Sequence, residues 1–70
     1  PATKSVFIEF NYYFKGNIEI INYYGEILHT EVINKSKRAI LDLSGLSNGM
    51  YVLRFRNNEL YSTVKILIIN

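Results

Sequence analysis

The sequence predicts an all-β fold, an Ig-like, Greek-key antiparallel β-sandwich of six or seven short strands. Ile, Val, Phe, Tyr and Thr, which favour strands, make up 27 of the 70 residues, whereas Ala occurs only twice. Apolar and polar residues alternate along several short segments, which is typical of half-buried strands. Eight Asn and four Gly residues supply turns between these segments.

Six segments carry the strand pattern, and they are residues 5–10, 18–23, 26–33, 38–43, 50–56 and 60–69. In the first, Val6 and Ile8 share one face, and the polar residues 15–17 that follow predict a turn. The second segment alternates in the same way. Gly25 then accepts the positive φ that a tight turn into the third segment requires.

The third segment places Leu28 on one face and His29 on the other, and the polar residues 34–37 predict a loop. The fourth segment turns Leu41 inward, and the fifth turns Arg54 outward to water. The shared period of two predicts a buried core formed by Val6, Ile8, Ile18, Ile20, Leu28, Leu41, Leu43, Leu46, Tyr51, Leu53 and Phe55.

The last segment ends in residues 64–69, a β-prone run with one charge and no proline. Such a run aggregates unless it is paired or covered. We therefore expect Ile66 and Ile68 to face the core and the strand to pair inside the sheet. If the run instead lies at an open edge, it favours a weak homodimer through that edge strand.

Composition excludes several classes of function. The chain has no cysteine, one histidine and one aspartate, His29 and Asp42, so it lacks the residues for a catalytic triad or a thiolate metal site. A net charge of +2 without a dense basic cluster does not indicate nucleic-acid binding. No segment reaches the roughly 18 apolar residues of a membrane span. We predict a non-enzymatic domain with no cofactor and no metal.

The remaining polar and aromatic candidates have simpler explanations. Glu9, Glu19, Glu26 and Glu31 occupy solvent-side or turn-adjacent positions, where a raised carboxyl pKa for acid–base catalysis is not expected. The tyrosines and phenylalanine at residues 12–14, together with Tyr23 and Tyr24, could form a sugar-stacking platform. In a chain this small, aromatic side chains more often fill the core.

The segment 42–51, with the sequence Asp-Leu-Ser-Gly-Leu-Ser-Asn-Gly-Met-Tyr, is the most informative. Ser44 can cap the turn through its hydroxyl, and Leu46 can close the open end of the core. The Asn-Gly pair that ends at Gly49 can supply left-handed residues. The hydroxyl of Tyr51 can reach back to a backbone group of the loop, as in a tyrosine corner.

These residues resemble the type A C-terminal sorting domain of the type IX secretion system (the Por secretion system C-terminal domain) of Gram-negative bacteria. Four motifs match in order: the opening residues 1–2, an Asn-x-x-Gly sequence at residues 22–25, the segment 42–51 and the closing residues 65–70. Its motif residues are Pro1, Ala2, Gly25, Asp42, Leu43, Ser44, Leu46, Gly49, Tyr51 and Lys65. One departure is that the chain ends Ile-Ile-Asn, whereas members often carry a basic residue among the last two or three positions.

The resemblance implies a sorting signal at the C-terminus of a larger exported protein. In that family an outer-membrane translocon recognises the folded domain after the cargo reaches the periplasm. A sortase-like peptidase then cleaves ahead of the domain and can join the cargo to a surface anchor, so the product is secreted or held at the cell surface. Because the chain starts at Pro1 rather than methionine, we expect residues 1–70 to be one domain of a longer protein with an upstream cargo domain.

Two alternatives remain open from the residues alone. Fibronectin type III modules carry a similar Leu-x-x-Gly…Tyr corner, usually with two residues between Gly and Tyr, and carboxypeptidase-regulatory-like modules share the Gly-x-Tyr strand start. Either would make the chain an accessory binding or spacer module of a secreted enzyme. A carbohydrate-binding module is supported only by the tyrosines.

Overall fold

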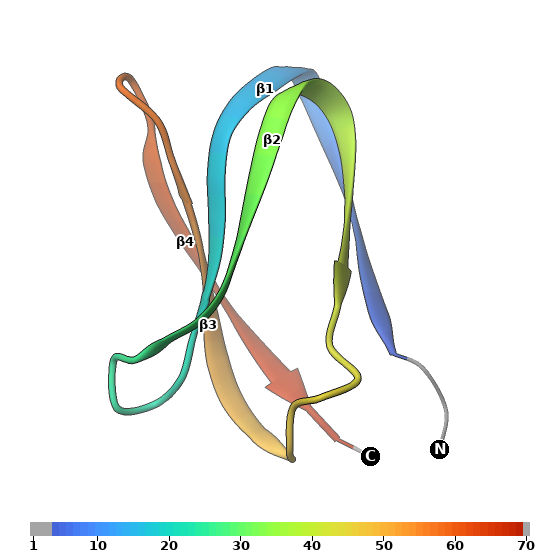
Figure 1. Cartoon of the computed structure of the whole chain (residues 1–70), viewed down its shortest axis with the longest axis vertical. Coiled ribbons are helices and arrows are strands. Elements are labelled where there is room, and N and C mark those ends of the chain that lie inside the picture. The colour runs from blue at the N-terminus through green and yellow to red at the C-terminus, as the bar shows by residue number, and fades with distance from the viewer. Residues whose placement is uncertain (1–3, 70) are drawn as a thin grey trace.

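The fold consists of antiparallel strands, and the computed structural model describes residues 4–69 (Figure 1). Its strands are β1 Ser5–Ile21, β2 Ile27–Asp42, β3 Gly49–Arg56 and β4 Tyr61–Ile68. They form one four-stranded sheet in the order β2-β1-β3-β4, and the described residues contain no helix. The predicted all-β, antiparallel class is therefore confirmed.

Strands β1 and β2 form one long hairpin that bends back over itself. Residues 5–9 pair with residues 38–42 to form what we call the folded half. Residues 16–21 pair with residues 27–33 to form the sheet half, and β3 pairs with the β1 strand of this half. Figure 1 shows both strands arching over at one end of the molecule and running back toward the other.

The number of strands predicted from the sequence is wrong, and the bend is the reason. Each of the six predicted segments overlaps a strand, but residues 15–17 and 34–37 do not end the strands in which they lie. The backbone instead bends through register shifts between Glu9 and Phe14 and between Phe14 and Gly16. On β2, Lys35 adopts a φ of 60°. Four strands in one doubled sheet therefore replace the six or seven strands and two sheets that were predicted.

The hydrophobic core lies between the two halves of this hairpin. Phe14 has no exposed surface, and its ring stacks on Phe10 at 4.8 Å between centroids. Phe55 of β3 presents its ring edge to both, at 6.0 Å from Phe10 and 6.4 Å from Phe14. The buried apolar residues are Phe14, Ile18, Ile20, Ile33, Ala39, Leu41, Leu43, Tyr51, Leu53, Phe55 and Ile68.

The predicted core is largely confirmed, with one clear error. Val6, Ile8 and Leu46 are partly buried against the core rather than fully enclosed. Leu28 is exposed, because the register places His29 opposite Ile20. Ile21 then faces Ile27, so Leu28 is the extra residue at a register shift and has no facing partner on β1.

A buried carboxylate lies on the face of the sheet opposite the core. Glu19 is only 3% exposed, because the side chains of Arg54 and Arg56 cover it. Arg54 Nε donates to Glu19 Oε1 at 2.6 Å, and this hydrogen bond lowers the pKa of Glu19 from its usual value. The Glu19 carboxylate was expected on the solvent side. It instead joins β1 to β3, because Glu19 and Arg54 face each other across these two strands.

Strand β4 completes the sheet. Ile68 is buried and Ile66 packs partly buried against the core, as predicted. The prediction that the strand pairs inside the sheet is wrong, because β4 is the last strand in the order and pairs only with β3 among the described residues.

Because β1 approaches the end of β3 closely, substitutions at two glycines should have different effects on stability. A Cβ on Gly16 would lie 2.5 Å from the Arg56 carbonyl oxygen and 2.9 Å from the Phe14 ring, whereas a Cβ on Gly45 would meet nothing within 4 Å. We expect Gly16→Ala to lower the free energy of unfolding by about 1–3 kcal/mol through overpacking, and Gly45→Ala to leave it nearly unchanged. Urea unfolding of both variants measures this, and equal midpoints would contradict the close approach.

Candidate functional site

Most of the family-motif residues recognised in the sequence lie at one end of the molecule, opposite the bend. The start of β1 lies beside the end of β2 there, and the start of β3 lies beside the end of β4, because Ser5 faces Asp42 and Gly49 faces Ile68. The Leu43 amide donates to the Lys4 carbonyl oxygen at 2.8 Å, and Lys4 Nζ donates to the Ile69 carbonyl oxygen. We call the surface formed by Lys4, residues 22–25, residues 43–48 and Ile69 the motif end (Figure 1).

The turn between β1 and β2 is organised by one side chain. Asn22 Oδ1 accepts hydrogen bonds from the amides of Tyr24 at 3.0 Å and Glu26 at 2.9 Å, and Asn22 Nδ2 donates to the Glu26 carboxylate at 2.7 Å. Gly25 adopts a φ of 87°, as predicted, and its amide donates to the Asn22 carbonyl oxygen. This Asx-type turn fixes the backbone of residues that carry little buried surface.

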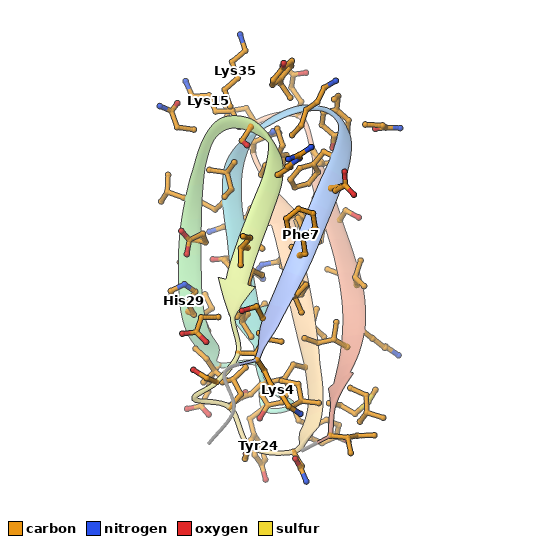
Figure 2. The ribbon with its side chains drawn as sticks, turned by 90° about the vertical axis from the view of Figure 1, so that its right-hand side faces the viewer. Lys4, Phe7, Lys15, Tyr24, His29 and Lys35 are labelled. Carbon is orange, nitrogen blue, oxygen red and sulfur yellow. The ribbon has the colours of Figure 1, made fainter. Side chains whose placement is uncertain are left out.

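Two tyrosines project from this turn into solvent. Tyr23 and Tyr24 are 85% and 86% exposed, and their rings meet edge to face at 6.0 Å. Figure 2 shows Tyr24 at the same end of the molecule as Lys4 and far from Lys15 and Lys35 at the bend. The hydrogen bonds of Asn22 therefore hold an exposed aromatic pair on a fixed backbone.

The connection from β2 to β3 begins with a second side-chain cap. Asp42 Oδ1 accepts the Ser44 amide at 2.9 Å, so the cap comes from Asp42 rather than from the Ser44 hydroxyl that the sequence suggested. The Ser44 hydroxyl and amide together lower the pKa of the Asp42 carboxyl. Leu43 is buried, and Leu46 packs partly exposed against the core, as expected for a residue that closes its open end.

The same connection ends in a tyrosine corner, as predicted. The hydroxyl of Tyr51 donates to the Ser47 carbonyl oxygen at 2.7 Å, while its ring is buried. Gly49 carries a φ of 151°, but Asn48 has no positive φ, so only one residue of the predicted left-handed pair is confirmed. The corner fastens the loop of the motif end to the core.

The remaining predicted motif residues are placed differently. Lys65 lies on β4 opposite Val52 and is exposed on the face of the sheet away from the core. Pro1 and Ala2 lie outside the described residues.

Comparison with known families explains why these segments occur together. A family model described as the secretion system C-terminal sorting domain matches residues 1–70, the whole chain. The chain belongs to this family. It is a C-terminal sorting signal for type IX secretion, a function that implies interaction with the type IX machinery and a cargo exported across the outer membrane.

The family match favours the sorting function over an accessory β-sandwich module. The family is not a catalytic one. No curated protein and no solved structure matched the chain.

Sequence reasoning missed two features of the sorting domain's motif end. The side chain of Asn22 was noted only as a motif letter, although an Asn three residues before a Gly is a recognisable signal for a side-chain-capped turn. Tyr23 and Tyr24 were considered only as core residues or a sugar platform. Their exposure follows from the turn, which carries them beyond the edge of the core.

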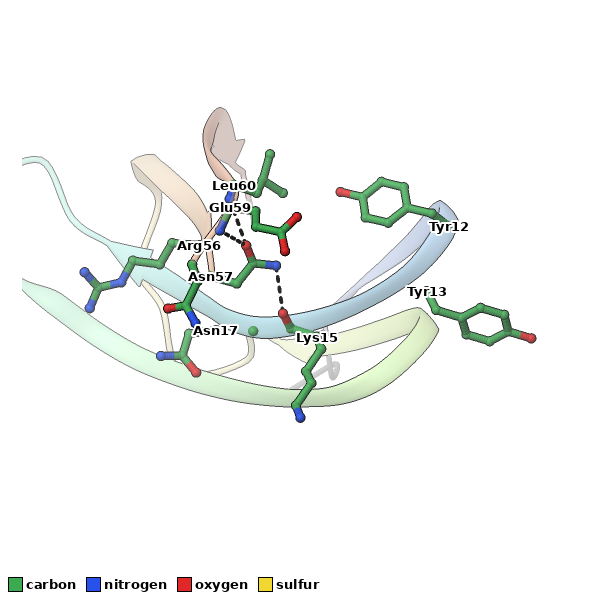
Figure 3. A pocket seen from close by; sticks show the side chains of 10 residues that line it. Tyr12, Tyr13, Lys15, Asn17, Arg56, Asn57, Glu59 and Leu60 are labelled. Carbon is green, nitrogen blue, oxygen red and sulfur yellow. Dashed lines mark hydrogen bonds between the residues drawn. The ribbon is translucent and has the colours of Figure 1, made fainter.

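The aromatic residues of the sorting domain do not form one platform. Phe14 is buried, and Tyr12 and Tyr13 lie in the bend between Glu9 and Phe14, whereas Tyr23 and Tyr24 lie in the turn between β1 and β2. Beside Tyr12 and Tyr13 is an open hollow of about 880 Å³ (Figure 3). Its central amide, Asn57, is already used, because it donates to the Lys15 carbonyl oxygen and accepts from the amides of Glu59 and Leu60.

The titratable side chains of the described region do not gather into a reactive site. His29 Nε2 lies 3.0 Å from Glu31 Oε1, and both side chains are exposed. Within residues 4–69 no three His, Cys, Asp or Glu side chains are grouped so that they could hold a metal ion. The same residues include no helix with the length and apolar character needed to cross a membrane.

The tyrosine corner predicts a graded response to substitution of Tyr51. Tyr51→Phe removes the hydroxyl that bonds to Ser47 and should cost about 1 kcal/mol of stability. Tyr51→Ala also removes a buried ring and should cost about 3–5 kcal/mol. Urea unfolding gives both values. An alanine variant that unfolds at the parental midpoint would show that Tyr51 is not part of the core.

Proposed function

We propose that the motif end is the surface through which the outer-membrane translocon of the type IX system reads this sorting domain. The observation that carries the proposal is the convergence of segments that are far apart in sequence. The turn at residues 22–25, the loop at residues 43–48 and the end of β4 lie at the same end of the molecule (Figure 1), and each contains or adjoins family-motif residues. A folded domain can therefore present as one surface what the sequence holds in separate pieces.

The exposed tyrosine pair is the part of this surface best suited to bind a protein. Tyr23 and Tyr24 contribute almost no buried surface to the sheet, so the fold does not need them. Tyrosine is enriched among the residues that dominate binding energy, because it offers a large apolar area with a polar tip. The Asn22 turn fixes the backbone beneath the pair, which reduces the entropy lost on binding.

The later stages of export follow from the same placement. Lys4 contacts Ile69 at the motif end, so an upstream cargo domain would join the sorting domain beside the surface that the translocon reads. A sortase-like peptidase acting ahead of the domain would then meet its cleavage region next to this surface. Residues 1–70 act as one domain in this scheme, and the cargo passes through the periplasm to the cell surface or the medium.

Paired tyrosine substitutions test the proposal. Residues 1–70, preceded by a short linker, are fused to a periplasmic fluorescent protein in a cell with a type IX system. Tyr23→Ser with Tyr24→Ser should reduce export by about tenfold, the effect of losing a binding hot spot. Tyr12→Ser with Tyr13→Ser removes two tyrosines that are less exposed and lie at the other end of the molecule, and it should leave export close to the parental level.

Urea unfolding of both double variants ensures that export is compared between folded domains. Normal export of the Tyr23 and Tyr24 variant would contradict the assignment of the motif end. An equal loss in both double variants would also contradict it, because the effect would then not depend on the end of the molecule.

A further inference from the structure

The outer edge of β4 is open. Strand β4 hydrogen-bonds only to β3 among the described residues, so one row of its backbone N–H and C=O groups has no strand partner there. Figure 1 shows this strand at the margin of the sheet. Only an extended backbone can form regular hydrogen bonds with all the groups of such a row, so the partner that fits this edge is another strand.

The side chains of β4 protect this edge only weakly. Tyr61, Val64 and Leu67 are exposed, and Lys65 is the strand's only charged residue. The opposite edge of the sheet, formed by residues 27–33 of β2, carries the exposed His29–Glu31 pair. Charged residues and short length are the usual protection of an edge against pairing, so β4 is the less protected of the two.

We infer that β4 pairs antiparallel with β4 of a second copy of this chain, about a two-fold axis at Val64. The axis stands perpendicular to the sheet, and residues that face each other across antiparallel strands lie on the same side of the sheet. Both conditions hold only when one residue of the strand faces the same residue of the second copy. Near the middle of the strand this residue is Thr63, Val64 or Lys65.

Charge and apolar contact select among these three registers. An axis at Lys65 places two lysines directly opposite each other, which is unfavourable. An axis at Thr63 places Leu67 opposite the carboxylate of Glu59. An axis at Val64 joins the two valines, places Lys65 opposite Thr63, and pairs the exposed Leu67 with the exposed Tyr61, an aliphatic–aromatic contact of the kind that stabilises sheets.

The dimer is expected to be weak. The strand has only eight residues, so the pairing buries far less surface than a standard interface of about 1,600 Å². The β1–β2 turn with its tyrosine pair lies on the far side of β3 from this edge, so pairing leaves that turn open. The inference therefore stands apart from the proposed recognition by the translocon.

A single cysteine tests both the dimer and its register. The chain contains no cysteine, and residues that face each other across antiparallel strands have Cα atoms about 4.5–5.5 Å apart, within the range of a disulfide. Val64→Cys in the purified chain should form a covalent dimer under mild oxidation about tenfold faster than Val32→Cys. Val32 is the matched control, because it is an exposed valine on the opposite edge strand.

Two further measurements complete the test. In a sedimentation concentration series, the parent should associate reversibly, and Val64→Lys should weaken association by about tenfold, because it places two lysines face to face. A mixture of Ser62→Cys and Ile66→Cys chains should form mixed covalent dimers, since these positions face each other in the Val64 register.

Three results would overturn the inference. One is a monomeric parent at every concentration, with equal oxidation rates for Val64→Cys and Val32→Cys. Another is faster crosslinking of Lys65→Cys than of Val64→Cys, which would show a different register. The third is a monomeric parent whose export from cells is blocked by Val64→Lys, which would assign the edge to a strand of the secretion machinery instead.

Discussion

The burial of Phe14 is the constraint on which the rest of the fold depends. Its ring has no exposed surface and packs against both Phe10 of the same strand and Phe55 of β3. A single flat sheet offers no such enclosure, so β1 must bend to cover the ring, and β2 bends with it through their pairing. Gly16 allows the bend, because a side chain there would collide with the Arg56 carbonyl oxygen. The doubled hairpin thus gives a 70-residue chain two layers around one core without a disulfide.

The bend also determines where function can be placed. Because β1 and β2 each return to the end from which they start, four strands bring most of their ends to one side of the molecule. The turn held by Asn22, the loop held by Asp42 and Tyr51, and the contact of Lys4 with Ile69 are then at the same end of the molecule (Figure 1). A sorting signal must be recognised as a folded object, and this arrangement collects its motif segments into one surface.

Local patterns in the sequence were enough to predict the strand segments, most of the core and the tyrosine corner. They could not separate a turn from a bend, since residues 15–17 and 34–37 have the same polar, Gly- or Asn-containing composition in either case. They also could not give register, which depends on pairing with distant residues. That is why Leu28 was placed inside and β4 was placed within the sheet. At the motif end, Asn22 and Asp42, whose side chains cap the backbone, were noted in the sequence only as motif residues.

The doubled hairpin is tested most directly by nuclear Overhauser contacts between the rings of Phe10 and Phe55 in a phenylalanine-labelled chain. Phe10 lies in the bend directly after the folded half, Phe55 lies on β3 of the sheet half, and the ring centroids are 6.0 Å apart. Cross-peaks between the ring protons of these two residues are the predicted result. If Phe10 instead shows contacts only to neighbours along its own strand and to β2, while Phe55 shows none to Phe10, the hairpin does not double over and the account fails.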